Sequence, residues 1–260
     1  MISSKELLKH SFHKSMRRFF VEPSLISENS AGITGQEFRH IVKVLRLSKG
    51  DEIFLVDGRG FHYRAVIDSI GRYELTVKIL EKKILKTEPG IEVTLFQGFL
   101  KGGKFDMVVQ KATELGTRKI VPVEFSRSDL KIEKIDNEKI KRWQRIAEYA
   151  ACQSGRITVP RVESPGKFKE IFSSLKDFDL KLVFWEEAEK SSLKEIMRNS
   201  KNIETIALIL GPEGGLTSQE VMEAEKGGAL AASLGPRILR AETAAIAALT
   251  AVMYELGDMG

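Results

Sequence analysis

Cysteine and long apolar runs are nearly absent from this sequence. The 260 residues include one cysteine, Cys152, which excludes an internal disulfide and any metal site built from several cysteines. Apolar stretches such as residues 205–210 are far shorter than the roughly 20 residues that span a bilayer. Residues 1–15 lack the continuous apolar core of a signal peptide. We therefore expect a globular cytoplasmic protein without a membrane segment.

Histidine is also scarce. The four histidines, His10, His13, His40 and His62, show no metal-ligand spacing with carboxylates or with the cysteine, so we predict no metal. Cys152 lies in the helical pattern of residues 147–153, where a small apolar residue is expected. Core packing is therefore favoured over covalent cysteine chemistry.

The positive charge is unevenly distributed. The net charge is +5, and residues 1–88 account for all of it, with 16 Lys and Arg against 11 Asp and Glu. An excess confined to one segment is typical of a surface that binds a polyanion such as RNA. A solvated lysine-rich face would give the same composition, and charge alone does not separate the two interpretations.

Short strands dominate the first third of the chain. Apolar alternation predicts strands over 19–21, 52–56, 63–69 and 74–80, with a turn at Asp57-Gly58. One helix is expected between them, opened by Thr34 with Glu37 three residues later, and extending to Leu45. This pattern predicts a small β-barrel, followed by a linker over residues 86–90 that contains proline and glycine.

Strands and helices alternate from residue 91 onward. Strands are predicted at 91–97, 119–123, 180–185, 205–210 and 231–234, and helices at 104–115, 137–153, 192–198, 218–226 and 242–256. Such alternation is typical of an α/β domain with a largely parallel sheet, whose ligands bind beyond the carboxyl ends of the strands. Three loops fall at such positions: Trp185-Glu186, 211–215 and 235–240.

Two of these loops have unusual composition. Residues 211–215 read Gly-Pro-Glu-Gly-Gly, which allows backbone to approach a flat or anionic ligand closely. Taken alone, they fit equally well a tight turn before a helix capped by Thr217 and Glu220. Residues 234–243 end a strand in Gly-Pro, flank Ile238-Leu239 with two arginines and open a helix. Its first-turn amides are suited to a carboxylate.

The combined motifs resemble the 16S rRNA (uracil-N3) methyltransferase family, RsmE type, of the SPOUT superfamily. They are residues 17–20 (RRFF), 40–46 (HIVKVLR), 110–116 (QKATELG), 153–156 (QSGR), 211–215 (GPEGG) and 234–243 (LGPRILRAET). The resemblance covers nearly the whole chain from Met16. It implies an extension over 1–15, a PUA-like RNA-binding β-barrel over 16–86, and a SPOUT α/β domain with a trefoil knot over 87–260. It further implies a homodimer that uses S-adenosyl-L-methionine to methylate a uridine near the decoding centre of 16S rRNA, in the small ribosomal subunit.

The same resemblance suggests roles for individual residues. The expected cofactor-binding residues are Trp185, Leu210, Gly211, Pro212, Glu213, Gly214, Gly215, Leu234, Gly235, Ile238, Leu239, Thr243 and Ala244. The expected RNA-binding residues are Arg17, Arg18, His40, Lys43, Arg46, Lys101 and Lys104. Arg240, Arg156 and Glu242 are the catalytic candidates, the two arginines as stabilisers of a uridine anion. Glu213 or Glu242 would serve as general base if burial raised its pKa, and solvent hydroxide is the alternative.

Three other functions compete with this assignment. Residues 98–104 fit the spacing of a phosphate-binding loop, but Phe105 stands where a Ser or Thr hydroxyl must hold magnesium, which argues against nucleotide hydrolysis. A SPOUT enzyme that methylates another RNA position, such as a ribose 2′-hydroxyl, is not excluded by the pocket motifs. A non-enzymatic RNA-binding assembly factor is a third reading, against which the intact pocket motifs argue.

Overall fold

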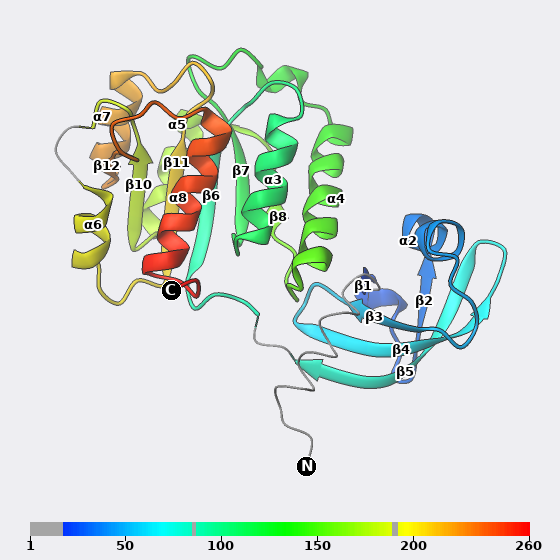
Figure 1. Cartoon of the computed structure of the whole chain (residues 1–260). Coiled ribbons are helices and arrows are strands. Elements are labelled where there is room, and N and C mark those ends of the chain that lie inside the picture. Colours follow the sequence, from blue (N-terminus) through cyan, green and yellow to red (C-terminus); the bar gives the residue numbers. More distant parts are fainter. Residues whose placement is uncertain (1–17, 85–86, 189–191) are drawn as a thin grey trace. The chain divides into compact units, whose positions relative to one another are not determined.

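The chain forms two compact units in the computed structural model, which describes residues 18–84, 87–188 and 192–260 (Figure 1). The amino-terminal unit comprises Met1–Glu88 together with Ala151–Val159. The carboxy-terminal unit comprises Pro89–Ala150 and Pro160–Gly260. The predicted extension over residues 1–15 lies outside the described residues.

A five-stranded sheet builds the amino-terminal unit. Its strands are β1 (Arg18–Phe20), β2 (Ser30–Thr34), β3 (Glu52–Val56), β4 (Phe61–Ile70) and β5 (Glu74–Ile84). Their order is β1-β3-β4-β5-β2, in which only the pair β1 and β3 is parallel. Alternate residues of β4, such as Tyr63 and Ile67, point into an apolar core because side chains alternate between the faces of a strand.

A short helical segment covers this core. The α-helix α2 (Gly35–Arg39) continues into the π-helix η3 (His40–Val44), and η2 (Pro23–Leu25) is a single 3₁₀ turn. Phe38 and Ile41 are buried in the core of the unit. Thr34 is the N-cap residue of α2, as predicted, but its side chain makes no capping hydrogen bond.

The carboxy-terminal unit is an α/β domain with a parallel sheet, as the alternation predicted. Its strands are β6 (Glu92–Gly98), β7 (Lys119–Glu124), β8 (Arg161–Val162), β9 (Gly166–Lys167), β10 (Leu180–Phe184), β11 (Thr205–Leu210) and β12 (Leu230–Ala232). The order is β12-β10-β11-β6-β7-β8, with β9 paired to β7, and every pair is parallel.

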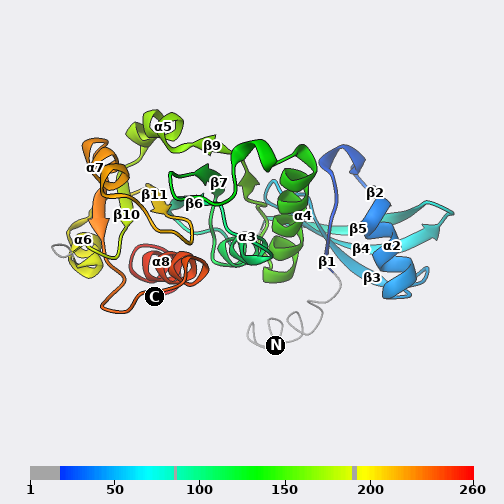
Figure 2. The ribbon, with the colours of Figure 1, turned by 90° about the horizontal axis from the view of Figure 1, so that it is seen from above.

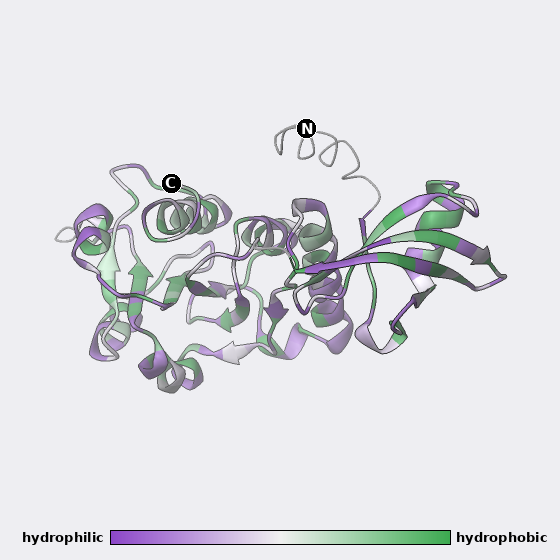
Figure 3. Cartoon of the chain, turned by 90° about the horizontal axis from the view of Figure 1, so that it is seen from below, coloured by the Kyte–Doolittle hydropathy of each residue, from purple (hydrophilic) through white to green (hydrophobic). Residues whose placement is uncertain are grey.

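Helices cover both faces of this sheet. They are α3 (Lys104–Glu114), α4 (Asn137–Ser154), α5 (Phe168–Ile171), α6 (Leu193–Asn199), α7 (Ser218–Lys226) and α8 (Ala241–Glu255), with 3₁₀ turns η4 (Ile132–Lys134) and η5 (Phe172–Asp177). In Figure 1, α8, α3 and α4 stand in front of the sheet, whereas α5 and α7 lie on its other side in Figure 2. The central strands of this unit are largely hydrophobic (Figure 3) because both of their faces are buried. No helix in the described ranges is long and apolar enough to span a bilayer.

Candidate active site

A cavity of about 490 Å³ opens at the carboxyl ends of the parallel strands in the carboxy-terminal unit. Strands β10, β11 and β12 end at Phe184, Leu210 and Ala232, and residues that follow each of them line the cavity. Ligands of open parallel sheets bind at this edge, and small-molecule sites typically measure about 300–1,000 Å³. The position and size of the cavity suit a ligand of nucleoside dimensions.

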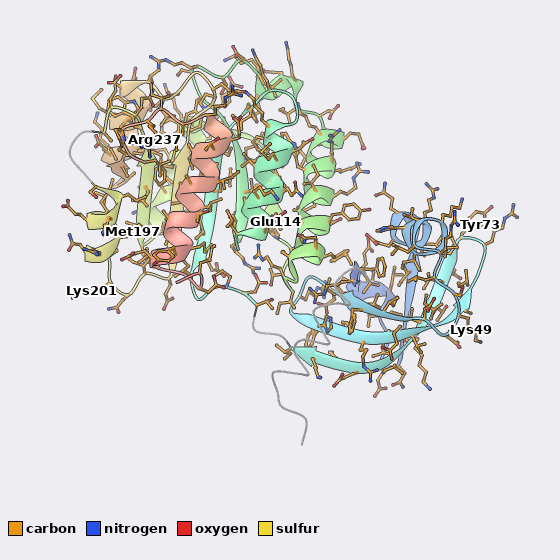
Figure 4. All side chains as sticks on the ribbon, viewed as in Figure 1. Lys49, Tyr73, Glu114, Met197, Lys201 and Arg237 are labelled. Carbon is orange, nitrogen blue, oxygen red and sulfur yellow. The ribbon has the colours of Figure 1, made fainter. Side chains whose placement is uncertain are left out.

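The two motif segments meet in this cavity. Of the residues expected at the cofactor site, all but one line it: Trp185, Leu210, Gly211, Pro212, Glu213, Gly214, Gly215, Leu234, Gly235, Ile238, Leu239 and Ala244. Thr243 is exposed on the first turn of α8 and is not among the lining residues. Arg240, Glu242 and Lys104 line the cavity as well, and so does Arg237, which the sequence reasoning did not select (labelled in Figure 4).

The glycine loop, residues 211–215, is held directly against strand β6. A Cβ atom at Gly98 would lie 2.4 Å from the backbone nitrogen of Pro212 and 2.6 Å from the carbonyl carbon of Gly211. The amide of Gln97 donates a hydrogen bond to the Gly211 carbonyl oxygen at 3.2 Å. Gly215 adopts a positive φ of 72°, which favours glycine. The loop conformation is therefore fixed by backbone contact with its neighbours.

Glu213 is anchored by the segment that resembled a phosphate-binding loop. Its Oε1 accepts hydrogen bonds from the backbone N–H of Lys101 at 3.0 Å and from Nζ of Lys104 at 3.1 Å. Burial raises the pKa of the Glu213 carboxyl, but these donors outweigh that effect and hold its pKa below the ordinary value. Glu213 therefore does not meet the condition set for a general base, which required a raised pKa.

Arg127 is a second anchor of the glycine loop, and sequence reasoning missed it. It follows β7, and its Nη1 donates to the carbonyl oxygens of Gly214 at 3.3 Å and Leu216 at 3.2 Å. A Cβ atom at Gly214 would lie 2.9 Å from the backbone oxygen of Arg127. No local motif marks this arginine, because its partners lie 87 and 89 residues away in the sequence.

The amino-terminal end of α8 faces the cavity without a side-chain cap. Arg240 is the N-cap residue and makes no side-chain capping bond to the first-turn N–H groups. Glu242, in that first turn, is only 9% exposed, and its Oε2 has no hydrogen-bond partner among the described residues. Arg237 and Arg240 are exposed, and none of the described acidic residues forms an ion pair with either of them. First-turn N–H groups without a side-chain cap, a buried carboxylate and two exposed guanidinium groups thus belong to residues that line one cavity.

Arg156 lies elsewhere, in the amino-terminal unit. It is 4% exposed, and its guanidinium Nε and Nη2 both donate to Oε2 of Glu88. It does not line the cavity. Within this chain, Arg156 is engaged in an internal ion pair with Glu88, and its contact with uridine stays a prediction.

The residues expected to bind RNA fall into two groups. Lys43 and Arg46 are exposed at the end of the helical segment of the amino-terminal unit, where Arg46 adopts the uncommon positive φ of 52°. Arg18 is partly buried, and burial lowers the pKa of its guanidinium. His40 packs edge-on against Phe19. Arg17 lies outside the described residues.

Lys101 and Lys104 form the other group, in the carboxy-terminal unit. Nζ of Lys101 pairs with Asp129 at 2.8 Å, and Nζ of Lys104 pairs with Glu213 at 3.1 Å. Both lysines therefore already have acidic partners.

The positive excess of the first 88 residues is concentrated outside the described sheet. Residues 18–84 and 87–88 contain 11 Lys and Arg and 10 Asp and Glu, so they are almost neutral. The remaining excess belongs to residues 1–17 and to Lys86. A polyanion-binding surface on the sheet must therefore depend on local placement of a few cations.

Known proteins share both units of this chain. An RNA methyltransferase domain model matches residues 81–253, and an RNA methyltransferase PUA domain model matches residues 33–80. The chain is 35% identical over 248 residues to Ribosomal RNA small subunit methyltransferase E of Bacillus subtilis, covering 92% of this chain and 97% of the relative. It is 33% identical to the protein of that name from Mesomycoplasma hyopneumoniae, with 90% and 98% coverage.

Solved structures agree with these matches. The Ribosomal RNA small subunit methyltransferase E of Neisseria gonorrhoeae, bound to S-adenosyl methionine, is similar with a TM-score of 0.85 at 31% identity, covering 94% of this chain and 99% of the other. A methyltransferase of Legionella pneumophila solved in complex with the same cofactor has a TM-score of 0.85 at 29% identity, with 93% and 98% coverage. The chain therefore belongs to the RNA methyltransferase family that includes the ribosomal RNA small subunit methyltransferase E proteins.

Proposed function

We propose that this protein methylates N3 of a uridine near the decoding centre of 16S rRNA, using S-adenosyl-L-methionine. The observation that carries the proposal is the cavity in which the glycine loop, residues 234–240 and the uncapped end of α8 meet. Membership of the RNA methyltransferase family supports the reaction class, and the names of the relatives support the small-subunit RNA as substrate. The choice of uridine N3 rests on the family resemblance that the sequence motifs carry.

The residues of the cavity fit the proposed cofactor. Leu234, Ile238 and Leu239 offer apolar surface for an adenine ring, and the glycine loop leaves backbone accessible. The first-turn N–H groups of α8 receive no capping bond from the side chain of Arg240, and such groups suit a carboxylate. When bound, the cofactor would supply an electrophilic methyl group.

Arg240 is the proposed catalytic arginine. Uridine N3 carries a proton at neutral pH, and its loss leaves negative charge on the ring carbonyl oxygens. An exposed guanidinium at the cavity, with no acidic partner among the described residues, is available to stabilise that charge. Glu213 is held in its ionised form by Lys101 and Lys104, so we assign it to loop anchoring and the proton to solvent.

Three larger-scale features belong to the same proposal. Residues 16–86 would form a PUA-like RNA-binding barrel and 87–260 a SPOUT domain with a trefoil knot, and the protein would act as a cytoplasmic homodimer. The PUA domain match over residues 33–80 supports the first of these. Sedimentation equilibrium of the purified protein tests the dimer, which a single species of monomer mass would contradict.

The decisive experiment locates the methyl group. The protein is incubated with labelled cofactor and either bare 16S rRNA or purified small subunits, and the modified nucleoside is identified by mass spectrometry. N3-methyluridine at one position is the expected product. A methyl group on carbon or on a ribose 2′-oxygen would overturn the N3 assignment, and no transfer to either RNA would favour a non-enzymatic assembly factor.

Arg240→Ala tests the catalytic assignment. Loss of one transition-state donor is expected to lower turnover by about 100- to 1,000-fold while cofactor affinity changes little. Single-turnover kinetics measure the first quantity and calorimetry the second. If cofactor affinity fell by the same factor as turnover, Arg240 would be a cofactor-binding residue.

A further inference from the structure

A highly exposed tyrosine lies at the tip of the hairpin formed by β4 and β5. Tyr73 is 71% exposed, more than any other aromatic side chain among the described residues, and it extends outward from the hairpin (Figure 4). The hydrogen bond that closes the turn is a backbone bond, from the N–H of Gly71 to the carbonyl oxygen of Glu74 at 2.8 Å. The ring of Tyr73 is therefore left for contact with another molecule, and burial of such a ring is favourable.

Arg72 lies against one side of this ring. Its guanidinium Cζ is 5.2 Å from the ring centroid, within the range of about 6 Å for a cation–π contact. Because the ring of Tyr73 is still mostly exposed, its other face is open. An open aromatic face beside a guanidinium group is the kind of surface on which an unpaired nucleic-acid base stacks.

The helical segment formed by α2 and η3 adjoins the hairpin tip. Thr34 pairs with Glu74 in the register of β2 and β5, and α2 begins directly after Thr34. The segment and the residue that follows its last turn carry three exposed cations, Arg39, Lys43 and Arg46. None of the three forms an ion pair with an acidic side chain in the described part of the chain. They are therefore available to an anionic ligand.

Positive charge is in excess on this hairpin-tip surface, defined as residues 35–46 and 70–74. These residues contain four Lys and Arg but only two Asp and Glu. The acidic Asp68, which follows closely along β4, is already paired with Lys49 at 3.6 Å. A local excess of cations attracts the phosphate groups of a nucleic acid. Charge and an open aromatic face thus occur together on one surface.

We propose that the hairpin-tip surface binds a single-stranded segment of the RNA substrate, with one unpaired base stacked on Tyr73 and the neighbouring phosphates bound by the cations of the helical segment. A base within a duplex is covered on both faces by its neighbours, so only an unpaired base is open to the ring. The inference rests on the proposed function, since RNA is the ligand considered. It adds Arg39, Arg72 and Tyr73 to the residues expected to bind RNA.

The affinity for a short RNA tests the stacked base. The probe is a uridine strand of about ten nucleotides with one fluorescent adenine analogue, 2-aminopurine, and the same strand in a full duplex is the comparison. Calorimetry gives the Kd for the full chain, and quenching of 2-aminopurine reports the stack. Tyr73→Ala should weaken the single strand about 5- to 150-fold, the range for one base stacked on an aromatic ring, and leave the duplex unchanged.

Two further variants serve as controls. Tyr73→Phe keeps the ring and should bind the single strand as the wild type does. Tyr254→Ala removes a tyrosine that is 63% exposed on α8, in the other unit, and should also change nothing. Hydrogen exchange in β4 and β5 should be the same in Tyr73→Ala and in the wild type, which shows that the hairpin is intact.

The cations have a separate signature in the salt dependence. Each phosphate contact that is lost reduces the slope of log K against log salt concentration by about 0.7 for a single strand. Lys43→Ala should therefore reduce this slope, whereas Tyr73→Ala should lower the affinity at an unchanged slope. An unchanged slope in Lys43→Ala would remove the helical segment from the site.

The outcomes separate this inference from the proposed function. If the wild type binds no single strand, or if Tyr73→Ala binds it as tightly as the wild type, the stacking site is wrong, whatever the methylation assay gives. Equal losses in Tyr73→Ala and Tyr73→Phe would assign the contact to the hydroxyl group and would also overturn the stack. A Tyr73-dependent affinity in a protein that transfers no methyl group to RNA would retain the site while the proposed function fails.

Discussion

Two glycines at the ends of the connection between β6 and α3, Gly98 and Gly103, differ sharply in their surroundings. An added Cβ at Gly98 would meet the backbone of Gly211 and Pro212 at 2.6 and 2.4 Å, whereas nothing lies within 4 Å of a Cβ at Gly103. Backbone atoms cannot rotate away as a flexible side chain can. At the scale of single residues, the shape of the cavity therefore depends on one missing methyl group at Gly98.

Gly98→Ala is expected to displace the glycine loop, lower the free energy of unfolding by about 1–3 kcal/mol and weaken cofactor binding. Gly103→Ala, at the N-cap of α3, is the control; it should lower the free energy of unfolding by less than about 1 kcal/mol and leave cofactor binding unchanged. Trp143 and Trp185, the two tryptophans of the chain, both belong to the carboxy-terminal unit. Their fluorescence during urea unfolding reports on this unit. Equal behaviour of the two variants would contradict the described contact.

The partly buried His62 is expected to make the stability of the amino-terminal unit depend on pH. It stacks on Phe54, and burial, with the charges of Arg18 and Lys83, lowers its pKa from 6.5 to about 4. The unfolded chain binds this proton near pH 6.5 and the folded chain only near 4. His62 thus stabilises the amino-terminal unit fully above pH 6.5, and this contribution is lost as the pH falls toward 4.

An NMR titration checks this expectation. The ring proton of His62, identified by its loss in His62→Asn, should titrate near pH 4. A midpoint near 6.5 would show that the side chain is hydrated in solution and that the stability of the unit does not depend on its protonation.

At the scale of elements, helix α7 is joined to β7 through its cap. Thr217 accepts a hydrogen bond from the backbone N–H of Glu220, and Glu220 accepts from Thr217 N–H and from its hydroxyl. The other oxygen of Glu220 accepts from Ser126 N–H, in the loop after β7, at 2.8 Å. Glu220 therefore acts both in the capping box and as a link between two segments beside the glycine loop.

Thr217→Ala should lower the free energy of unfolding by about 1 kcal/mol, as for other caps. Glu220→Ala should cost about 2 kcal/mol, because it also leaves partly buried donors of Thr217 and Ser126 without an acceptor. Urea unfolding monitored by tryptophan fluorescence gives both values. Equal losses in the two variants would mean that the Ser126 bond contributes nothing.

The sequence predicted most elements because their periodicity reflects burial. The predicted strands and helices of the carboxy-terminal unit recur with shifts of a few residues, and Thr217 and Glu220 form the expected capping box. Strand β2 was missed, since Ser30 and Gly32 are weak strand formers and the segment is ordered by pairing with β5. β8 and β9 are two residues each, too short to leave a pattern.

Residues of the candidate site could be predicted only where they lie close together in the sequence. The glycine loop and residues 234–240 were selected from composition and motif, and they do share one cavity. Gln97 and Arg127 hold the loop from positions 114 and 87 residues away, so no local signal marks them. The lack of a hydrogen-bond partner for Glu242 Oε2 among the described residues results from tertiary packing, which cannot be predicted from local sequence.

At the scale of the whole molecule, Arg156 connects two distant segments of the amino-terminal unit. Glu88 accepts from the Arg156 guanidinium and, at 3.2 Å each, from the backbone N–H groups of Ile157 and Thr158. The linker after β5 is thereby tied to residues 151–159, which follow most of α4. Arg156 is nearly inaccessible, and its removal leaves the Glu88 carboxylate with its backbone donors but no cationic partner.

Arg156→Ala is expected to destabilise the amino-terminal unit by about 3 kcal/mol. Hydrogen exchange in β3–β5 should accelerate, while cofactor affinity and the tryptophan unfolding transition remain as in the wild type. Arg161→Ala, which removes an arginine whose side chain is 76% exposed, is the control and should change little. Lost turnover with unchanged hydrogen exchange would instead support the predicted catalytic role of Arg156.

The course of α4 affects how the protein could have been assembled in evolution. The helix starts in the carboxy-terminal unit, and its last residues, from Ala151, belong to the amino-terminal unit together with the segment up to Val159. A single gene break near residue 88 would therefore separate the sheet of the amino-terminal unit from nine residues of its own fold. Joining gene fragments at one point therefore cannot exchange either unit intact between two relatives. A functional chimera with a relative requires matched junctions at all three boundaries, after residues 88, 150 and 159.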